Sequence, residues 1–158
     1  MTDSPNLIGD IIAALKRAGC IVEPCGSRVT CNPPPVDTDA DYLVQVPRTD
    51  SKIAGLVSYL SGRGFEWEGG EHYQMSMTGD FMSFRHDYIN FIVTANEVFA
   101  ARHRVATGLC RQLNLMQKPD RIALFQAVLY GVAYDPSLNK IGPVNALMAL
   151  VEADPITF

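Results

Sequence analysis

The stretch from Cys25 to Val46 reads CGSRVTCNPPPVDTDADYLVQV, and it places a glycine-serine pair ahead of acids at alternate positions. Side chains alternate between the two faces of a β-strand, and residues two apart lie about 6.6 Å from each other along it. Asp39 and Asp41 therefore share a face with Leu43, while Tyr42 and Val44 share the other. We expect a strand that is apolar on one face and begins acidic on the other.

The sequence around this strand predicts further strands and two helices. Apolar residues recur at helical spacing after Pro5, until Gly19, and again from Asp50 to Leu60. Short apolar or alternating runs predict strands at residues 20–24, 65–69, 81–85 and 88–94, with a tight hairpin at His86–Asp87.

The last third of the sequence is predominantly helical in pattern. Residues 94–97 form a capping-box candidate in front of a helix with an apolar stripe at Val98, Val105, Leu109 and Leu113. Pro119 and Gly131 bracket another helix, and the pair at 142–143, Gly-Pro, opens a short last one.

The chain length and composition predict a single globular domain. A chain of 158 residues is long enough for one compact core and too short for two ordinary domains with a linker. Hydrophobic residues make up 47% and charged residues 19%, which argues against disorder. We expect an α+β fold over residues 1–158, with a mixed β-sheet in residues 1–94 and a helical part in residues 95–158.

Charge and hydropathy limit which classes of partner and which cellular location we expect for the chain. A net charge of −4 gives no support for general nucleic-acid binding. The apolar runs fall short of a bilayer span, and the N-terminal residues lack the features of a signal peptide. We therefore expect no membrane association and a cytoplasmic location.

The four cysteines predict no metal site. Cys20, Cys25 and Cys31 cluster in the sequence, but their spacing matches no paired zinc motif. Reduced thiols that pack as small hydrophobic side chains are the better prediction.

Two carboxylates on one strand face repel each other, and a divalent cation relieves that repulsion. Hard oxygen ligands of this kind suit Mg²⁺ or Mn²⁺. Gly26 would let the backbone approach a phosphate closely, and Ser27 with nearby amides could bind its oxygens. The stretch thus combines a candidate phosphate loop with candidate metal ligands.

The glycine-serine pair, an eleven-residue gap and the DADYLV strand are similar to the pattern of the nucleotidyltransferase superfamily. Residues 20–131 also resemble small nucleotidyltransferase-like proteins encoded by bacteriophages, which implies the cytoplasm of an infected bacterium as the location. The resemblance implies a polymerase-beta-like fold that transfers a nucleoside monophosphate from a nucleoside triphosphate, with two metals, to an unknown acceptor. It implies that Gly26, Ser27 and Arg28 bind the triphosphate and that Asp39 and Asp41 bind the metal.

The third acid of that pattern is where this sequence departs. The position that matches the family's later strand carboxylate is Asn90, and a neutral amide is a weaker metal ligand than a carboxylate. Asp87 lies three residues earlier and would reach the site only from a hairpin bend or a bulge. Both residues are candidate catalytic positions.

Basic residues in the last third are candidate partners of a polyphosphate. Arg104, Lys118 and Arg121 would neutralise its oxygens if the two helices bordered the acidic strand. A solvated helix face explains the arginines equally well. Acids at a strand start can also be ordinary turn and edge residues.

Three functions remain open on this sequence, and one of them is a purely structural interaction module that binds no ligand. The first is a metal-dependent nucleotidyltransferase. The second is a catalytically degenerate member of the same fold that binds a nucleotide or a protein, and Asn90 is the residue that supports it.

Overall fold

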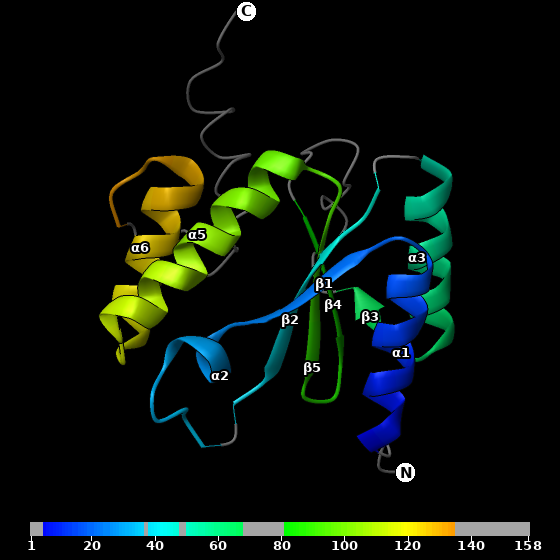
Figure 1. Ribbon diagram of the computed structural model, residues 1–158, viewed down its shortest axis with the longest axis horizontal. Helices are drawn as coiled ribbons and strands as arrows, with labels where there is room; N and C mark the ends of the chain where they lie inside the picture. Colours follow the sequence, from blue (N-terminus) through cyan, green and yellow to red (C-terminus); the bar gives the residue numbers. More distant parts are fainter. Residues whose placement is uncertain (1–4, 37, 48–49, 68–80, 135–158) are drawn as a thin grey trace, which may run out of the picture.

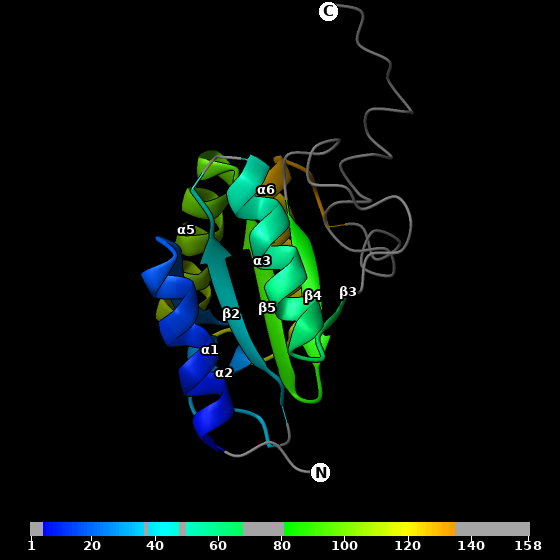
Figure 2. The same cartoon turned by 90° about the vertical axis from the view of Figure 1, so that its right-hand side faces the viewer.

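The computed structural model describes residues 5–36, 38–47, 50–67 and 81–134, and these form three layers. Helices α1 and α3 cover one face of a twisted sheet, and α5 and α6 cover the other (Figures 1 and 2). The prediction of an α+β fold with a mixed sheet and flanking helices is confirmed.

The sheet has five strands in the order β1-β2-β5-β4-β3. The central pair, β2 with β5, is parallel, and the other three pairs are antiparallel. The strands are β1 (Ile21–Cys25), β2 (Ala40–Gln45), β3 (Glu66–Trp67), β4 (Met82–His86) and β5 (Ile89–Thr94).

The face of the sheet under α1 (Pro5–Arg17) and α3 (Asp50–Gly62) holds the larger hydrophobic core. Ile11 and Leu15 of α1 and Leu56 and Leu60 of α3 are buried against it, as their helical spacing predicts. The even-numbered residues of β2 and the odd-numbered residues of β5 supply the sheet side of this core, namely Val44, Ile89, Phe91 and Val93.

The opposite face lies under α5 (Glu97–Leu113) and α6 (Lys118–Tyr130), with the short helix α2 (Ser27–Thr30) at one end (Figure 1). A smaller apolar cluster forms here around Leu43, Phe99 and Leu129. The helix α5 turns Phe99, Ala100, His103, Ala106 and Cys110 inward.

The apolar stripe predicted on α5 is not its buried face. An amphipathic helix ordinarily turns its apolar stripe toward the core. Here all four stripe residues, Val98, Val105, Leu109 and Leu113, are exposed among the described residues. The aromatic and small residues between them pack inward instead, because Phe99 and His103 stack with Phe81 and Phe125.

Several element ends differ from the prediction by one residue, as in β1, which spans Ile21–Cys25 instead of residues 20–24. Asn96, rather than Thr94, caps α5, because its side-chain oxygen accepts from the amides of Val98 and Phe99 at 3.0 and 3.1 Å. The hairpin turn consists of Asp87 and Tyr88, one residue later than predicted. The helix predicted from residue 142 lies outside the described residues.

All four cysteines are unpaired and buried, which confirms their prediction as packed thiols. Burial raises the pKa of the Cys20 and Cys110 thiols. None of the described helices combines the length and the hydropathy that a membrane span requires.

Candidate functional site

The candidate site lies on the α5–α6 face, where β2 and β5 begin. The backbone pleat turns Asp39 and Asp41 to this face, the same one to which Leu43 contributes its buried side chain. Cys25 at the end of β1 pairs with Asp41, so the turn that follows β1 reaches the carboxylates directly. The predicted proximity of the glycine-serine turn and the acidic strand is thus present.

Gly26 touches Asp41 so closely that no side chain would fit. A Cβ atom built on Gly26 would clash with Oδ2 of Asp41, and the φ of Gly26 is +75°. This conformation is strained for any residue with a side chain. The glycine therefore permits both the turn and the approach of the carboxylate.

Ser27 and Arg28 fasten the turn to Thr38, the residue that precedes the acids. The hydroxyl of Ser27 lies 2.6 Å from that of Thr38, and the Arg28 guanidinium donates to the Thr38 carbonyl at 2.7 and 3.1 Å. The same guanidinium lies 5.6 Å from the ring centroid of Tyr88. Ser27 and Arg28 thus position the start of β2 in this structure.

Asn90 occupies the position beside Asp41 on the neighbouring strand. The two residues are directly paired in the β2–β5 register, and Asn90 donates its amide to Oδ1 of Asp41 at 3.1 Å. The amide oxygen of Asn90 accepts from the hydroxyl of Ser83 at 2.7 Å. Asn90 is only 9% exposed, so its amide is a buried, hydrogen-bonded part of the sheet.

Arg85 lies on the same face and is paired with Asp39. Its Nη1 donates to Oδ2 of Asp39 at 2.7 Å across the intervening strand. With Arg28 nearby, the site contains two acidic and two basic side chains. A charge-balanced arrangement of this kind holds the carboxylates in place without a bound ion.

Burial raises the pKa of Asp41 above its usual range, although the Asn90 hydrogen bond lowers it. The Asp39 carboxylate also raises this pKa, and the Arg85 and Arg28 guanidiniums lower it. The raised pKa means that burial disfavours the charged form of Asp41 by more than its hydrogen bond and the two guanidiniums favour it.

Asp39 and Asp41 are the residues that would hold a Mg²⁺ or Mn²⁺ ion, which would neutralise phosphate charge if it bound here. The neighbouring Asn90 amide does not suit the two-metal arrangement that the resemblance implies. Within the described ranges no three His, Cys, Asp or Glu side chains gather as a metal site. An ion on Asp39 would also compete with Arg85 for that carboxylate.

Asp87 lies in the β4–β5 turn with a φ of 56°, apart from the Asp41–Asn90 pair. It lines a polar cavity of about 320 Å³ at the β3–β4 edge of the sheet, together with Glu66, Arg85 and His86. Arg85 therefore lies between this cavity and Asp39. Asp87 does lie in a hairpin bend, as the sequence analysis required for a role in the site. From that bend it lines the neighbouring cavity.

Arg104 and Arg121, two of the predicted basic residues, bind groups other than Asp39 and Asp41. Arg104 binds both carboxylate oxygens of Glu23 at 3.0 and 3.1 Å and the Gln45 side chain at 2.6 Å. Gln45 is four residues, roughly 13 Å, along β2 from Asp41. Arg121 donates to the carbonyls of Leu115 and Met116 in the α5–α6 connection. Helices α5 and α6 do pack together, and Arg104 contacts β2 at Gln45, the end of the strand away from Asp41.

Lys118 is the first residue of α6, and it is exposed. No described contact ties Lys118 to Asp39 or Asp41. Its role as a phosphate ligand stays a prediction.

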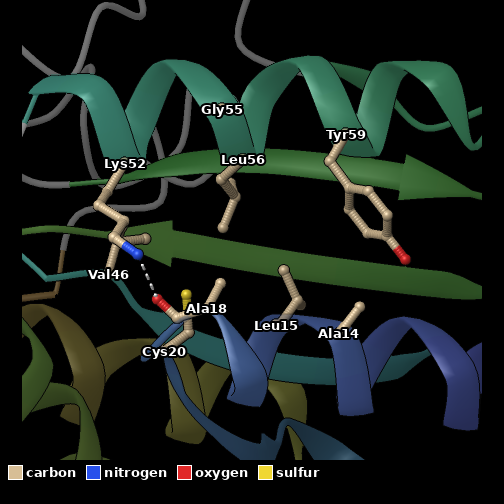
Figure 3. A pocket seen from close by; sticks show the side chains of 9 residues that line it. All are labelled: Ala14, Leu15, Ala18, Cys20, Val46, Lys52, Gly55, Leu56 and Tyr59. Carbon is tan, nitrogen blue, oxygen red and sulfur yellow. Dashed lines mark hydrogen bonds between the residues drawn. The ribbon is translucent and has the colours of Figure 1, made fainter.

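A second cavity, of about 260 Å³, lies on the opposite face of the sheet between α1 and α3 (Figure 3). Its walls are mostly apolar, and the small residues Ala14, Ala18 and Gly55 leave the space between the helices. Lys52 closes one end by donating to the Ala18 carbonyl at 3.1 Å. This cavity shares no residue with the carboxylates.

The sequence interpretation missed Thr38, Ser83 and Arg85. The signal for Ser83 and Arg85 was present, because polar residues alternate with Met82 and Phe84 along β4. Their distance from the carboxylates depends on the strand order, which places β4 next to β5. Local pattern alone does not specify that order.

The chain matches no family model and no curated protein. The resemblance to the nucleotidyltransferase superfamily stays a prediction, carried by Gly26–Ser27 and by Asp39 with Asp41.

Proposed function

We propose that this chain binds a nucleoside triphosphate with one Mg²⁺ or Mn²⁺ ion and that its nucleotidyltransferase-like site is catalytically degenerate. The observation that supports the proposal is the hydrogen bond from the Asn90 amide to Asp41, because the resemblance implies an acid where Asn90 stands. Two carboxylates suffice to hold one cation, whereas activation of an acceptor hydroxyl requires a further base or metal.

The surroundings of the carboxylates support a phosphate ligand. Gly26 brings main-chain atoms against Asp41 without a side chain in the way. Arg85 and Arg28 supply two guanidiniums near a bound anion, and guanidinium groups suit phosphate oxygens. When an ion binds Asp39, Arg85 becomes available to the phosphates.

Thermal unfolding with each ribonucleoside and deoxyribonucleoside triphosphate, with and without Mg²⁺ or Mn²⁺, tests the binding. A ligand at one hundred times its Kd stabilises the folded state by about 2.7 kcal/mol. We expect this stabilisation to require the cation and to be lost in Asp41→Asn. Asp10→Asn makes the same chemical change on an exposed position of α1 and should retain it.

Release of pyrophosphate separates the binder from the enzyme. We expect the unmodified protein to release none above background, and Asn90→Asp to bind the cation more tightly. Rapid pyrophosphate release by the unmodified protein would contradict the degenerate site. If no triphosphate stabilises the protein under any of these conditions, the binding proposal itself is wrong.

A further inference from the structure

A third cavity, of about 180 Å³, lies between α5 and the edge of the sheet that β1 forms. Residues of β1, α2, β2 and α5 line it, and it shares none of them with the two cavities described above. An engineered cavity of about 150 Å³ in another protein is large enough for a benzene molecule. This cavity therefore has room for a small organic ligand.

Two polar atoms of residues that line this cavity are buried without a hydrogen-bond partner in the part of the chain that the structure describes. They are Nδ1 of His103 and the hydroxyl oxygen of Thr107. The two residues lie one helical turn apart on α5, and His103 is only 6% exposed. A buried polar group without a partner costs free energy, which a ligand that supplies the missing hydrogen bonds would recover.

A ligand hydroxyl suits both of these groups. Burial lowers the pKa of His103 to about 4, so its ring is neutral near pH 7. One nitrogen of a neutral imidazole donates a hydrogen bond and the other accepts one, and the Thr107 hydroxyl can do either. Because a ligand hydroxyl also donates and accepts, it can pair with His103 whichever nitrogen carries the proton.

The charge around the cavity favours an anion. Arg111 lines the cavity one turn beyond Thr107 and is exposed, and no hydrogen bond or ion pair engages its side chain within the described ranges. Arg104 also lines the cavity, together with Glu23, its ion-pair partner. Two arginines and one glutamate leave a balance of +1. Guanidinium groups bind the paired oxygens of carboxylates and phosphates.

We propose that this cavity binds a small hydroxylated oxyanion, with hydroxyl groups toward His103 and Thr107 and the anionic group at Arg111. Polyol phosphates and sugar acids share this chemistry. Val29 and Leu43 also line the cavity and would contact the carbon atoms of the ligand. The site requires no metal ion, and it does not depend on the function proposed above.

NMR titration of the isotope-labelled full chain, in EDTA, tests the site with glycerol phosphate, glycerate, inorganic phosphate and glycerol. We expect glycerol phosphate or glycerate to shift the amides of residues 103–111. The better of the two should bind about tenfold more tightly than phosphate or glycerol, because each of these supplies only the anion or only the hydroxyls. The tighter ligand identifies phosphate or carboxylate as the preferred anionic group.

Substitutions of the lining residues test which groups hold the ligand. Arg111→Gln should weaken the binding of the better probe about tenfold, whereas Arg17→Gln, the same change on an exposed position of α1, should not change it. Glu23→Gln removes the acid from the lining and should tighten binding. Thr107→Val should raise the melting temperature of the ligand-free protein, because a buried unpaired hydroxyl is removed, and it should weaken binding.

Three results would each overturn the proposal. The first is that none of the four probes shifts the amides of residues 103–111. The second is an affinity that Arg111→Gln leaves unchanged, because the anion would then lie elsewhere. The third is a Thr107→Val variant that is more stable but binds as tightly as the unmodified protein, since the hydroxyl would then be only a packing defect. Because no divalent cation is present, failure of the triphosphate proposal would leave these outcomes unaffected.

Discussion

The two faces of the sheet differ in what their residues do, although the same strands supply both. Under α1 and α3 the buried positions are almost all apolar, and they form a single large cluster. Under α5 and α6 the apolar cluster is smaller, and the same strands turn Asp41, Asn90 and Arg85 to this side. One face therefore contributes stability, and the other carries polar groups whose burial costs stability.

Under the proposed function, this difference is the reason that the ligand would bind on the α5–α6 face. Polar groups that are buried and incompletely compensated gain most from a partner that supplies the missing charge. Asp41, whose pKa is raised by burial, is such a group. The apolar cavity between α1 and α3 has no equivalent residue, because its walls are mostly apolar. The comparison between the faces can be tested by substitutions on each.

The largest difference should come from two isoleucines on β5. Ile89 is 1% exposed in the α1–α3 core, whereas Ile92 is half-buried on the other face. Substitution of a buried isoleucine by alanine costs about 2–5 kcal/mol, depending on the space that is left. We expect Ile89→Ala to fall near the upper end and Ile92→Ala near the lower end in urea unfolding. Equal losses would mean that the two faces contribute alike.

Acid should destabilise the α5–α6 face through His103. Burial, with a contribution from Arg104, lowers the pKa of His103 to about 4. The unfolded chain binds the proton near pH 6.5, so stability is lost as the pH falls from 6.5 toward 4. The loss amounts to about 3 kcal/mol at pH 4.

His103→Phe keeps an aromatic ring against Phe99 and Phe125 and cannot titrate. The difference in unfolding free energy between the variant and the unmodified protein should widen steadily below pH 6.5. A constant difference from pH 7 to pH 4 would show that His103 is protonated in the folded protein as readily as in the unfolded chain.

Gly26→Ala should disturb the site more than the fold. The φ and ψ of Gly26, 75° and −169°, lie in a region that costs other residues about 1–3 kcal/mol. The added methyl group also displaces Asp41, so triphosphate-dependent stabilisation should disappear. Gly108→Ala is the control, because no atom lies within 4 Å of its Cβ position on α5. Gly108→Ala should stabilise the protein by about 0.5–1 kcal/mol. If Gly26→Ala still bound the triphosphate, the turn at Gly26 would not be part of the binding site.

The smallest effect should come from the Arg104–Glu23 ion pair. Both side chains are partly exposed, at 32% and 44%, and exposed pairs contribute about 0.2–1 kcal/mol. Glu23→Gln should therefore cost less than 1 kcal/mol, and the cost should shrink at high salt. A larger, salt-independent loss would show that the polar contacts between α5 and the sheet edge stabilise that face substantially.

The sequence predicted most elements correctly because their signals are local. The spacing of Ile11 and Leu15, the bracketing of α6 by Pro119 and Gly131, and the alternation along β2 all depend on residues that are close in the chain. The proximity of Gly26 to Asp41 was also predictable, because antiparallel pairing of neighbouring strands places the end of β1 beside the start of β2. The partners of Arg104, Glu23 and Gln45, could not be predicted because they are distant from it in sequence.

The sequence by itself determined which segments are helices and which are strands, and that β2 begins with acids on one face. It also made Asn90 a candidate for the third residue of the site. Only the tertiary structure decided that Arg85 pairs with Asp39, that Asp87 belongs to the adjacent cavity and that the α5 stripe faces outward. Periodicity is set by backbone geometry within one element, so it can be read locally. Strand order and the choice of buried helix face are set by long-range packing, in which Phe99 and His103 compete with Val105 and Leu109 for the same core.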